Sequence, residues 1–338
     1  MLAIEIYRWP ISDCNGVSPR NTRLRGQSII EYVLIIAVIG LVIEFAGPGV
    51  AGAIRNQFNQ VTNTVDSGTN GDNFISAEEK AYREAMKTVA SKEAKDWTLD
   101  EQKAAATDIA KNGTSSVVYA KAKAAMDAGT TWRVKLTNGK TMEYRIIGIN
   151  HDDMADGRGK AGLTFWVTNN AVGPARMNSS DTNTGGWEKS ELRAKMNSGE
   201  IWNLMPSDFQ SKVKPVVKLS NNVKGAIVDA AVTPTDDRLF LLSFSGIVEQ
   251  PYAWVSKYGW LGNEGTQYEA FMGLVTDGTT SSSCLKSPNG YQEYMAQRWQ
   301  RTAHPFNSNK FMGIDFSGQP RDSLDPASSS YVCPAFCF

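Results

Sequence analysis

The hydrophobic pattern divides the chain into stretches with different periods. Residues 29–45 form an almost unbroken apolar run of about 17 residues, at the short end of a bilayer span. Apolar positions then recur every three or four residues, as on one face of an amphipathic helix. These positions are Val50, Ile54, Phe58, Val61 and Val65. The pattern predicts one long helix over residues 27–65, with a kink or local break at Gly47-Pro48-Gly49.

Residues 66–129 are predicted to be a polar linker followed by a small helical spacer. One face of a first helix carries Tyr82, Met86 and Val89. Thr98 and Glu101 have the spacing of a capping box that starts a second helix, which should stop at Lys111-Asn112-Gly113. A third helix fits residues 115–128 and closes at Gly129.

From residue 130 the apolar period changes to that of strands. Residues 132–136 and 142–149 predict a hairpin with a two-residue turn at Asn138-Gly139. Further elements are predicted as strands over 163–167 and 239–243, a short helix over 187–197, and a last strand over 331–336. Pro334 places that last strand at a sheet edge or near its own end. The fold class predicted for residues 130–338 is α+β.

The apolar run near the N-terminus carries unusual polar flanks. Gly26-Gln27 precedes it, and the carboxylate of Glu31 lies inside it. An ionisable group within a membrane span is costly and usually functional. The basic flank Arg20, Arg23 and Arg25 orients the N-terminus of a span toward the cytoplasm. A secretory signal would carry its cleavage site after the apolar core, whereas here the small residue comes before it.

This arrangement resembles the prepilin signal of type IV pilins, and GQSIIEYVLII resembles the Flp (tight-adherence) subgroup over residues 20–65. The resemblance implies that a prepilin peptidase cleaves between Gly26 and Gln27 and removes residues 1–26 as a leader. Glu31 would then pair with the α-amino group of Gln27 on an adjacent pilin subunit and set the register of assembly. The alternative is that Glu31 extends to the lipid headgroups at the helix end.

The linker contains a partial calcium-loop pattern. Four oxygen-bearing residues fill positions three, five, nine and twelve of such a loop. They are Asn70, Asp72, Ser76 and Glu79. Gly68 at the first position and Asn73 at the sixth depart from the pattern. A capping box formed by Ser76 and Glu79 explains the same residues, and both interpretations stay open. No other cofactor is expected.

Charge and cysteine content limit the partner classes. Lys+Arg and Asp+Glu both number 35, so no charge excess indicates nucleic acid. Cys14 lies in the predicted leader, and the exported cysteines would be Cys284, Cys333 and Cys337. If residues 331–338 are extended, Cys333 and Cys337 lie about 13 Å apart, too far for a disulfide. We expect Cys284 to pair with one of them, unless residues 333–337 form a turn.

The C-terminal part of the chain resembles an uncharacterised bacterial extracellular domain, DUF6273. The resemblance rests on residues 185–197, 236–243, 298–303 and 331–336, in that order. The matching motif residues are Trp187, Ser190, Leu192, Arg193, Asn197 and Ser243. Gln300, Thr302 and Cys333 depart from the family pattern. The resemblance implies a fold related to C-type-lectin-like and formylglycine-generating-enzyme-like domains, without an established activity.

The residues themselves favour a structural role for that motif. Trp187 and Leu192 have the character of anchors that hold a helix on a sheet, and Arg193 can donate to carbonyls or a carboxylate. The sugar-binding signatures Glu-Pro-Asn and Trp-Asn-Asp of calcium-dependent lectins are missing. A glycan would then need another surface, for example Tyr252, Trp254, Tyr258 and Trp260.

The chain shows little catalytic chemistry in its sequence. Its two histidines are His151 and His304. His151-Asp152-Asp153 is expected to be a solvated turn after a strand and not a metal cluster. We therefore expect a protein that is not an enzyme.

These patterns together predict a pilin-like surface subunit, a minor or tip pilin because its head is so large. It would cross the cell membrane once before assembly and then stand on the cell surface. Its partners would be the prepilin peptidase, other pilin subunits and a glycan or protein ligand. The alternatives are a pseudopilin-like secretion component and a membrane-tethered enzyme with a formylglycine-generating-enzyme-like head.

Overall fold

The computed structural model describes residues 77–222, 232–252, 259–286, 297–305 and 307–338. Residues Ile75–Phe338 form one compact unit. The predicted leader, the cleavage site Gly26-Gln27, Glu31 and the helix over 27–65 lie outside the described residues. Within the described part, no helix is both long and apolar enough to cross a bilayer.

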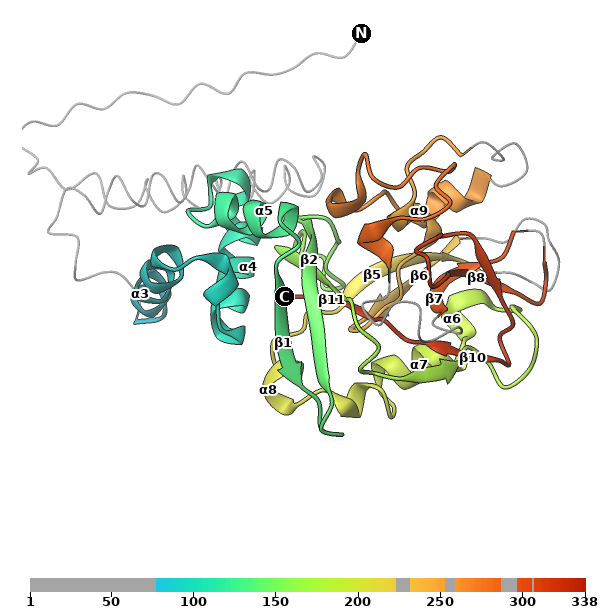
Figure 1. Cartoon of the computed structure of the whole chain (residues 1–338). Coiled ribbons are helices and arrows are strands. Elements are labelled where there is room, and N and C mark those ends of the chain that lie inside the picture. The colour runs from blue at the N-terminus through green and yellow to red at the C-terminus, as the bar shows by residue number, and fades with distance from the viewer. Residues whose placement is uncertain (1–76, 223–231, 253–258, 287–296, 306) are drawn as a thin grey trace, which may run out of the picture. The chain divides into compact units, whose positions relative to one another are not determined.

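The helical segment has the three predicted helices (Figure 1). They are α3 (Ala77–Ser91), α4 (Leu99–Asn112) and α5 (Tyr119–Asp127), with 3₁₀ turns η2 (Ala94–Asp96) and η3 (Gly113–Ser115) between them. The capping box is confirmed, because the Thr98 hydroxyl accepts from the Glu101 amide and the Glu101 carboxylate accepts from the Thr98 amide. Gly113 and Gly129 end their helices with positive φ angles of 58° and 64°.

These helices are part of the same core as the sheet that follows them. The Trp132 indole of strand β1 (Thr131–Lys135) donates to the Ala94 carbonyl at 3.1 Å, and the Tyr144 hydroxyl of strand β2 (Thr141–Ile149) donates to Gln102 at 3.0 Å. Ala105, Ala106 and Ile109 of α4 are fully buried. The predicted boundary between spacer and head, at residue 129, therefore falls inside one packed unit.

The first sheet has the order β1-β2-β3-β11, and all its pairs are antiparallel. Its strands are β1 (Thr131–Lys135), β2 (Thr141–Ile149), β3 (Leu163–Val167) and β11 (Ala335–Cys337). The predicted hairpin is confirmed, but its loop has three residues, 137–139, where two were expected. The Leu136 amide donates to the Lys140 carbonyl, and Gly139 takes a φ of 83°, which suits a three-residue loop closed by a left-handed glycine.

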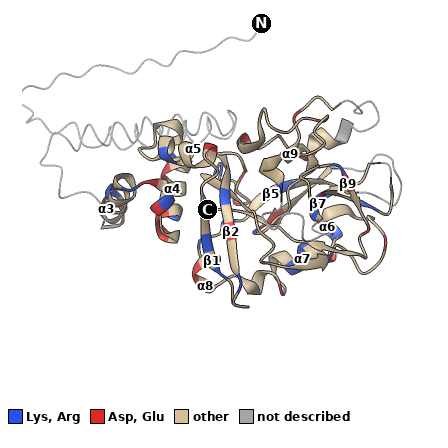
Figure 2. Ribbon diagram, viewed as in Figure 1, with Lys and Arg blue, Asp and Glu red and all other residues tan. Residues whose placement is uncertain are grey.

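Two further sheets complete the α+β architecture. The second has the order β4-β10-β7-β8-β9, with strands β4 (Pro174–Arg176), β10 (Ser329–Tyr331), β7 (Arg298–Ala303), β8 (Phe311–Ile314) and β9 (Asp322–Leu324). The third is the antiparallel pair β5 (Val216–Asn221) and β6 (Val232–Asp237). Figure 2 shows that positively and negatively charged residues are interspersed along the described elements.

Short helices connect the sheets. They are α6 (Gly186–Lys189), α7 (Glu191–Asn197), α8 (Ser207–Gln210), α9 (Phe244–Ile247), η4 (Trp202–Leu204), η6 (Gly259–Glu264), η7 (Glu269–Phe271) and η8 (Ser283–Leu285). The single helix predicted over 187–197 is wrong, because the chain breaks at Ser190, where ψ is 140°. The Ser190 hydroxyl accepts from the Arg193 amide and caps α7 instead of continuing α6.

Two strand predictions also need correction. Residues 239–243 do not form a strand; they are a fully buried extended segment with one bridge, between Phe240 and Ala335. Their apolar side chains belong to the core. The carbonyls of Leu239 and Leu241 accept from the side chains of Asn197 and Arg301, whereas those of Phe240 and Leu242 accept from the backbone amides of Ala335 and Arg301. The last predicted strand is divided before Ala335, so that its two parts, in β10 and β11, belong to different sheets. Pro334, which has no amide hydrogen, lies between them.

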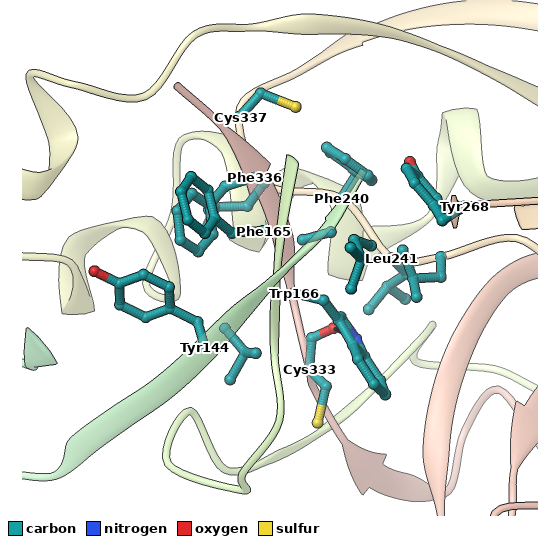
Figure 3. Packing of buried hydrophobic residues seen from close by; sticks show 14 of the residues in the cluster. Tyr144, Phe165, Trp166, Phe240, Leu241, Tyr268, Cys333, Phe336 and Cys337 are labelled. Atoms are coloured by element: carbon teal, nitrogen blue, oxygen red, sulfur yellow. Dashed lines mark hydrogen bonds between the residues drawn. The ribbon is translucent and has the colours of Figure 1, made fainter. Parts of the chain in front are cut away.

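The main core lies against β3 and β11 (Figure 3). The rings of Phe165 and Phe336 stack with centroids 5.2 Å apart, and Tyr144 meets both edge-on. Tyr144 joins β2 to this aromatic core. The residues that follow β2 in the sequence border a cavity.

Candidate functional site

The sequence motif of the C-terminal part forms a buried hub around Asp237, at the end of β6. The Trp187 indole donates to its carboxylate at 2.7 Å and Arg193 Nε at 2.6 Å, and the Thr235 hydroxyl donates at 3.0 Å. Asp237 is fully buried, so its charge needs these donors. Trp187 and Leu192 are also fully buried. These contacts agree with the structural interpretation of the motif.

The other motif residues hold connecting segments in place. The Asn197 amide donates to the Leu239 carbonyl, and its oxygen accepts from the Arg238 amide. Ser243 caps α9 by accepting from the Gly246 amide at 3.0 Å. The motif therefore fixes the segment 237–247, which borders the cavity described next.

A cavity of about 390 Å³ lies between the end of β2, strand β5 and the segment that contains η6. Its charged and aromatic lining residues are His151, Asp152, Asp153, Lys160, Lys218, Glu264, Tyr268 and Arg301. No sequence motif had grouped these residues, because they come from four separate parts of the chain. We call this the His151–Tyr268 pocket.

Asp152 and Lys218 form a buried ion pair at the floor of the pocket. The Tyr268 hydroxyl donates to Asp152 at 3.0 Å, and the Thr164 hydroxyl donates at 2.6 Å. Burial alone would raise the pKa of Asp152, but the charges of Lys218 and His151 and the hydrogen bonds from Lys218 and Thr164 lower it to about 2. Asp152 is 4% exposed, so the expectation of a solvated turn at 151–153 is wrong for this residue.

Two weak acids beside Asp152 are held in their neutral forms. Burial, followed by the negative charge of Asp152, raises the pKa of the Tyr268 phenol well above its ordinary value. The same two causes raise the pKa of the Cys337 thiol, whose sulfur lies 3.5 Å from Asp152. Both groups therefore act as hydrogen-bond donors at neutral pH.

The opposite wall is built from Glu264 and Arg301. Arg301, from β7, donates to the carbonyls of Leu219, Leu241 and Glu264 at 2.8–3.1 Å and so ties three segments together. The Glu264 side chain accepts from the Asn221 amide at 2.7 Å and from the Thr302 hydroxyl. Burial raises the pKa of Glu264 in spite of the opposing charge of Arg301.

Aromatic and charged groups surround the mouth of the pocket. The His151 imidazole stacks on the Tyr268 ring with centroids 4.1 Å apart, and its Nδ1 lies 3.4 Å from a Glu269 oxygen. Lys160 pairs with Asp153 at 3.0 Å and donates to the His151 carbonyl. Gly148 allows this approach, because a Cβ there would lie 2.9 Å from the Tyr268 ring.

The predicted disulfide is not present. Cys284, Cys333 and Cys337 are free thiols in the structure. Each sulfur contacts a different oxygen: Ser282 for Cys284, the Asn169 carbonyl for Cys333, and Asp152 for Cys337. Cys333 and Cys337 lie at opposite ends of an extended stretch (Figure 3), so the turn that could have joined them does not form.

The remaining predicted site residues are only partly covered by the structure. Asn70, Asp72 and Ser76 of the calcium loop lie outside the described residues, and Glu79 pairs with Arg83 at 3.0 Å. Among the described residues, no group of three or more His, Cys, Asp or Glu could hold a metal ion. Tyr252 is buried at 4% exposure, so it cannot belong to an exposed glycan surface. Trp254 and Tyr258 are not described, nor is the side chain of Trp260.

Comparison with known proteins assigns the C-terminal part. No curated protein and no solved structure matches the chain significantly. Residues 149–338 match the family described as a domain of unknown function, DUF6273. This range begins at the end of β2 and includes the Asp237 hub and the whole pocket lining. The match covers more than half of the 338 residues, and the chain therefore belongs to the DUF6273 family.

Proposed function

We propose that this chain is a pilin-like surface subunit whose head recognises a small polar ligand in the His151–Tyr268 pocket. The observation that carries the recognition role is the combination of mixed donors and acceptors with an aromatic wall in one cavity. Ligand sites in proteins commonly join an enclosed cavity with a few convergent polar groups. The sequence motif around Gly26 and Glu31 supports the pilin part of the proposal.

The electrostatics of the pocket favour binding over catalysis. Asp152, with a pKa of about 2, is too weakly basic to accept a proton at neutral pH. Tyr268 and Cys337 have raised pKa values and stay protonated, so neither supplies an anionic nucleophile. A cavity whose charges are already paired is suited to hold a neutral, hydrogen-bonding molecule.

A sugar residue of a glycan is the ligand class that fits this lining. Its hydroxyls both donate and accept, which matches ammonium groups beside carboxylates, and its apolar face can lie against the His151 ring, which is itself stacked on the buried Tyr268 ring. The cavity of about 390 Å³ is large enough for one or two sugar rings. The relationship to C-type-lectin-like domains is part of this proposal, without a calcium-dependent sugar motif.

The N-terminal helix would anchor the subunit in the membrane and later pack among other pilin subunits. A head this large suits a minor or tip subunit displayed at the cell surface. Cleavage between Gly26 and Gln27 by a prepilin peptidase would release the assembly-competent form. A calcium ion would bind at Asn70, Asp72, Ser76 and Glu79 in the linker.

Mass spectrometry of material sheared from intact cells tests the pilin part. We expect an N-terminal peptide that begins at Gln27 in the sheared fraction. An uncut N-terminus confined to membranes would contradict it and favour a tethered protein, while a processed chain retained within the envelope would favour the pseudopilin alternative.

Substitution of Glu31 tests the register argument. Glu31→Ala should be processed at Gly26 but should fail to enter the sheared fraction, because the buried charge pair with a neighbouring α-amino group is lost. Normal incorporation of this variant into filaments would show that Glu31 does not set the register.

Glycan-array binding by the full-length chain in detergent tests the recognition part. We expect His151→Ala and Lys160→Ala to weaken binding about tenfold or more, because both residues border the cavity. Lys140→Ala, at an exposed position next to the hairpin loop, is the matched control and should bind normally. Equal binding by all three variants would place glycan recognition outside the pocket.

A further inference from the structure

A second buried polar cluster lies outside the pocket, around Arg298 at the start of β7. Arg298 is 1% exposed, and among the described residues no oxygen or nitrogen atom accepts a hydrogen bond from its Nε, Nη1 or Nη2. Its guanidinium lies over the Trp166 ring, 5.3 Å from the centroid. An arginine cannot release its proton in a protein, so this positive charge stays inside the core.

A second guanidinium lies close to it. Arg145 is the cross-strand partner of Trp166, so the two side chains share a face of the sheet. Its guanidinium lies over Phe271, 5.7 Å from the centroid, and Trp166 and Phe271 meet edge-to-face at 5.8 Å. The Nε of Arg145 also lacks a partner, while one Nη donates to the Cys284 carbonyl at 3.3 Å.

The two charges influence each other. Burial lowers the pKa of Arg145; Cys284 opposes this effect, and the charge of Arg298 adds to it. Among the described residues, no carboxylate forms an ion pair with either arginine. The Cys333 thiol lies beside Arg298. Burial raises the pKa of this thiol, whereas the charge of Arg298 and a hydrogen bond between the two side chains act to lower it.

We propose that Arg298 and Arg145 bind a small monovalent anion of the chloride class. Buried charges without a counter-charge are strongly unfavourable, and four nitrogens of these two guanidiniums have no oxygen or nitrogen acceptor, so they form a strong donor set for an anion. Trp166 and Phe271 contact each other, and each carries one of the two guanidiniums over its ring, so the surroundings are apolar and tightly packed. Such surroundings favour a compact, weakly hydrated ion over a phosphate or a large organic acid.

Bromide substitution tests the site directly. Crystals of the full-length chain, solubilised in detergent and grown with bromide in place of chloride, should show one anomalous peak within contact distance of the Arg298 and Arg145 guanidiniums. An adventitious surface bromide would instead lie at exposed lysines. A data set with no peak at this cluster would overturn the proposal.

Thermal unfolding in solution provides a second test. Replacing sodium gluconate by sodium chloride at constant ionic strength should raise the Tm of the full-length chain by roughly 5 °C. The rise in Tm should level off as the chloride concentration increases, because the site becomes saturated. Arg298→Met should remove this chloride dependence. If Arg298→Met does not fold, Arg145→Met provides the test, because Arg145 is the less buried arginine. This variant should need at least a tenfold higher chloride concentration for half of the maximal rise in Tm.

Two controls separate specific anion binding from general salt screening and from a thiolate counter-charge. Arg133→Met, in the exposed strand β1, should keep the full chloride response. An equal response of all variants would show general salt screening and contradict the proposal. Thiolate absorbance near 240 nm that disappears in Cys333→Ser would also contradict it, by assigning the counter-charge to Cys333.

Discussion

At the scale of single residues, the pocket depends on buried charges that compensate one another. Asp152 and Lys218 are both almost fully buried and directly paired. Removing one partner leaves the other charge without compensation, which commonly costs several kcal/mol, whereas removing both costs less.

Asp152→Asn should therefore destabilise the protein by about 3 kcal/mol, because the Lys218 ammonium loses its counter-charge. Denaturant unfolding of the full-length chain measures this loss. The double variant Asp152→Asn with Lys218→Met should recover part of it, and Asp153→Asn, at a side chain that is 70% exposed, is the matched control. A double variant less stable than either single variant would contradict the argument.

The same residues predict how stability depends on pH. The folded pKa of Asp152, about 2, lies below its ordinary 3.8. Its contribution of roughly 2 kcal/mol is therefore present above about pH 4 and is lost as the pH falls toward 2. Glu264 has a raised pKa, so its effect has the opposite sign: stability is greatest below about pH 4.5 and declines as the pH rises through the folded pKa.

Urea unfolding between pH 2 and 8 distinguishes the two groups. Relative to wild type, Asp152→Asn should be least stable near neutral pH, and the difference should shrink in acid. For Glu264→Gln, the free energy of unfolding relative to that of wild type should be highest at neutral pH and should decrease as the pH falls to 4. Parallel curves for all three proteins would show that neither carboxyl group is linked to folding in this way.

At the scale of elements, α4 connects the helical segment to the sheets. Its N-terminus is fixed by the Thr98–Glu101 capping box, and its middle packs directly on the chain just before β3. Both features rest on particular residues that can be changed singly.

Thr98→Ala should lower the free energy of unfolding by about 1 kcal/mol, because the Glu101 amide loses its acceptor at the helix start. Thr107→Ala, an exposed change in the interior of the same helix, should be neutral or slightly stabilising. Equal losses in the two variants would mean that the cap has no special role.

Gly162→Ala should be more damaging, by roughly 3 kcal/mol or more. A Cβ at Gly162 would lie 1.8 Å from the Ala106 carbonyl oxygen, so α4 would have to move off the sheet. Gly278 has open surroundings and an ordinary φ angle, so Gly278→Ala is the control and should change little. Thermal unfolding of both variants provides the comparison.

At the scale of the whole molecule, residues Ile75–Phe338 behave as one packed unit. The buried residues of α4 and α5 belong to the same apolar cluster as the first sheet. The family match begins only at residue 149, so part of this unit lies outside the region that the family defines.

A fragment of residues 75–338 should accordingly fold more stably than one of residues 130–338. The shorter fragment would expose the buried faces of Trp132 and Tyr144 and should aggregate or lose several kcal/mol. Denaturant unfolding with size-exclusion chromatography compares the two. Equal stability would show that the helical segment is a separate spacer after all.

The sequence alone determined the local elements and the family of this chain. Helix caps, turn glycines and strand periodicity act over a few residues, so α4, α5, the β1–β2 hairpin and β3 were predictable, as was the DUF6273 resemblance. The break at Ser190 was missed although its cause is local, because the Ser190 hydroxyl caps α7 by accepting from the Arg193 amide. The extended segment 239–243 was not predictable, because its carbonyls are bonded by residues from distant segments. Only the tertiary structure brought Asp152, Lys218, Glu264 and Tyr268 together, and only it showed that the thiols stay apart. Some of these contacts join residues 185 positions apart in the sequence. The hydrophobic pattern of a short segment carries no information about partners so far away.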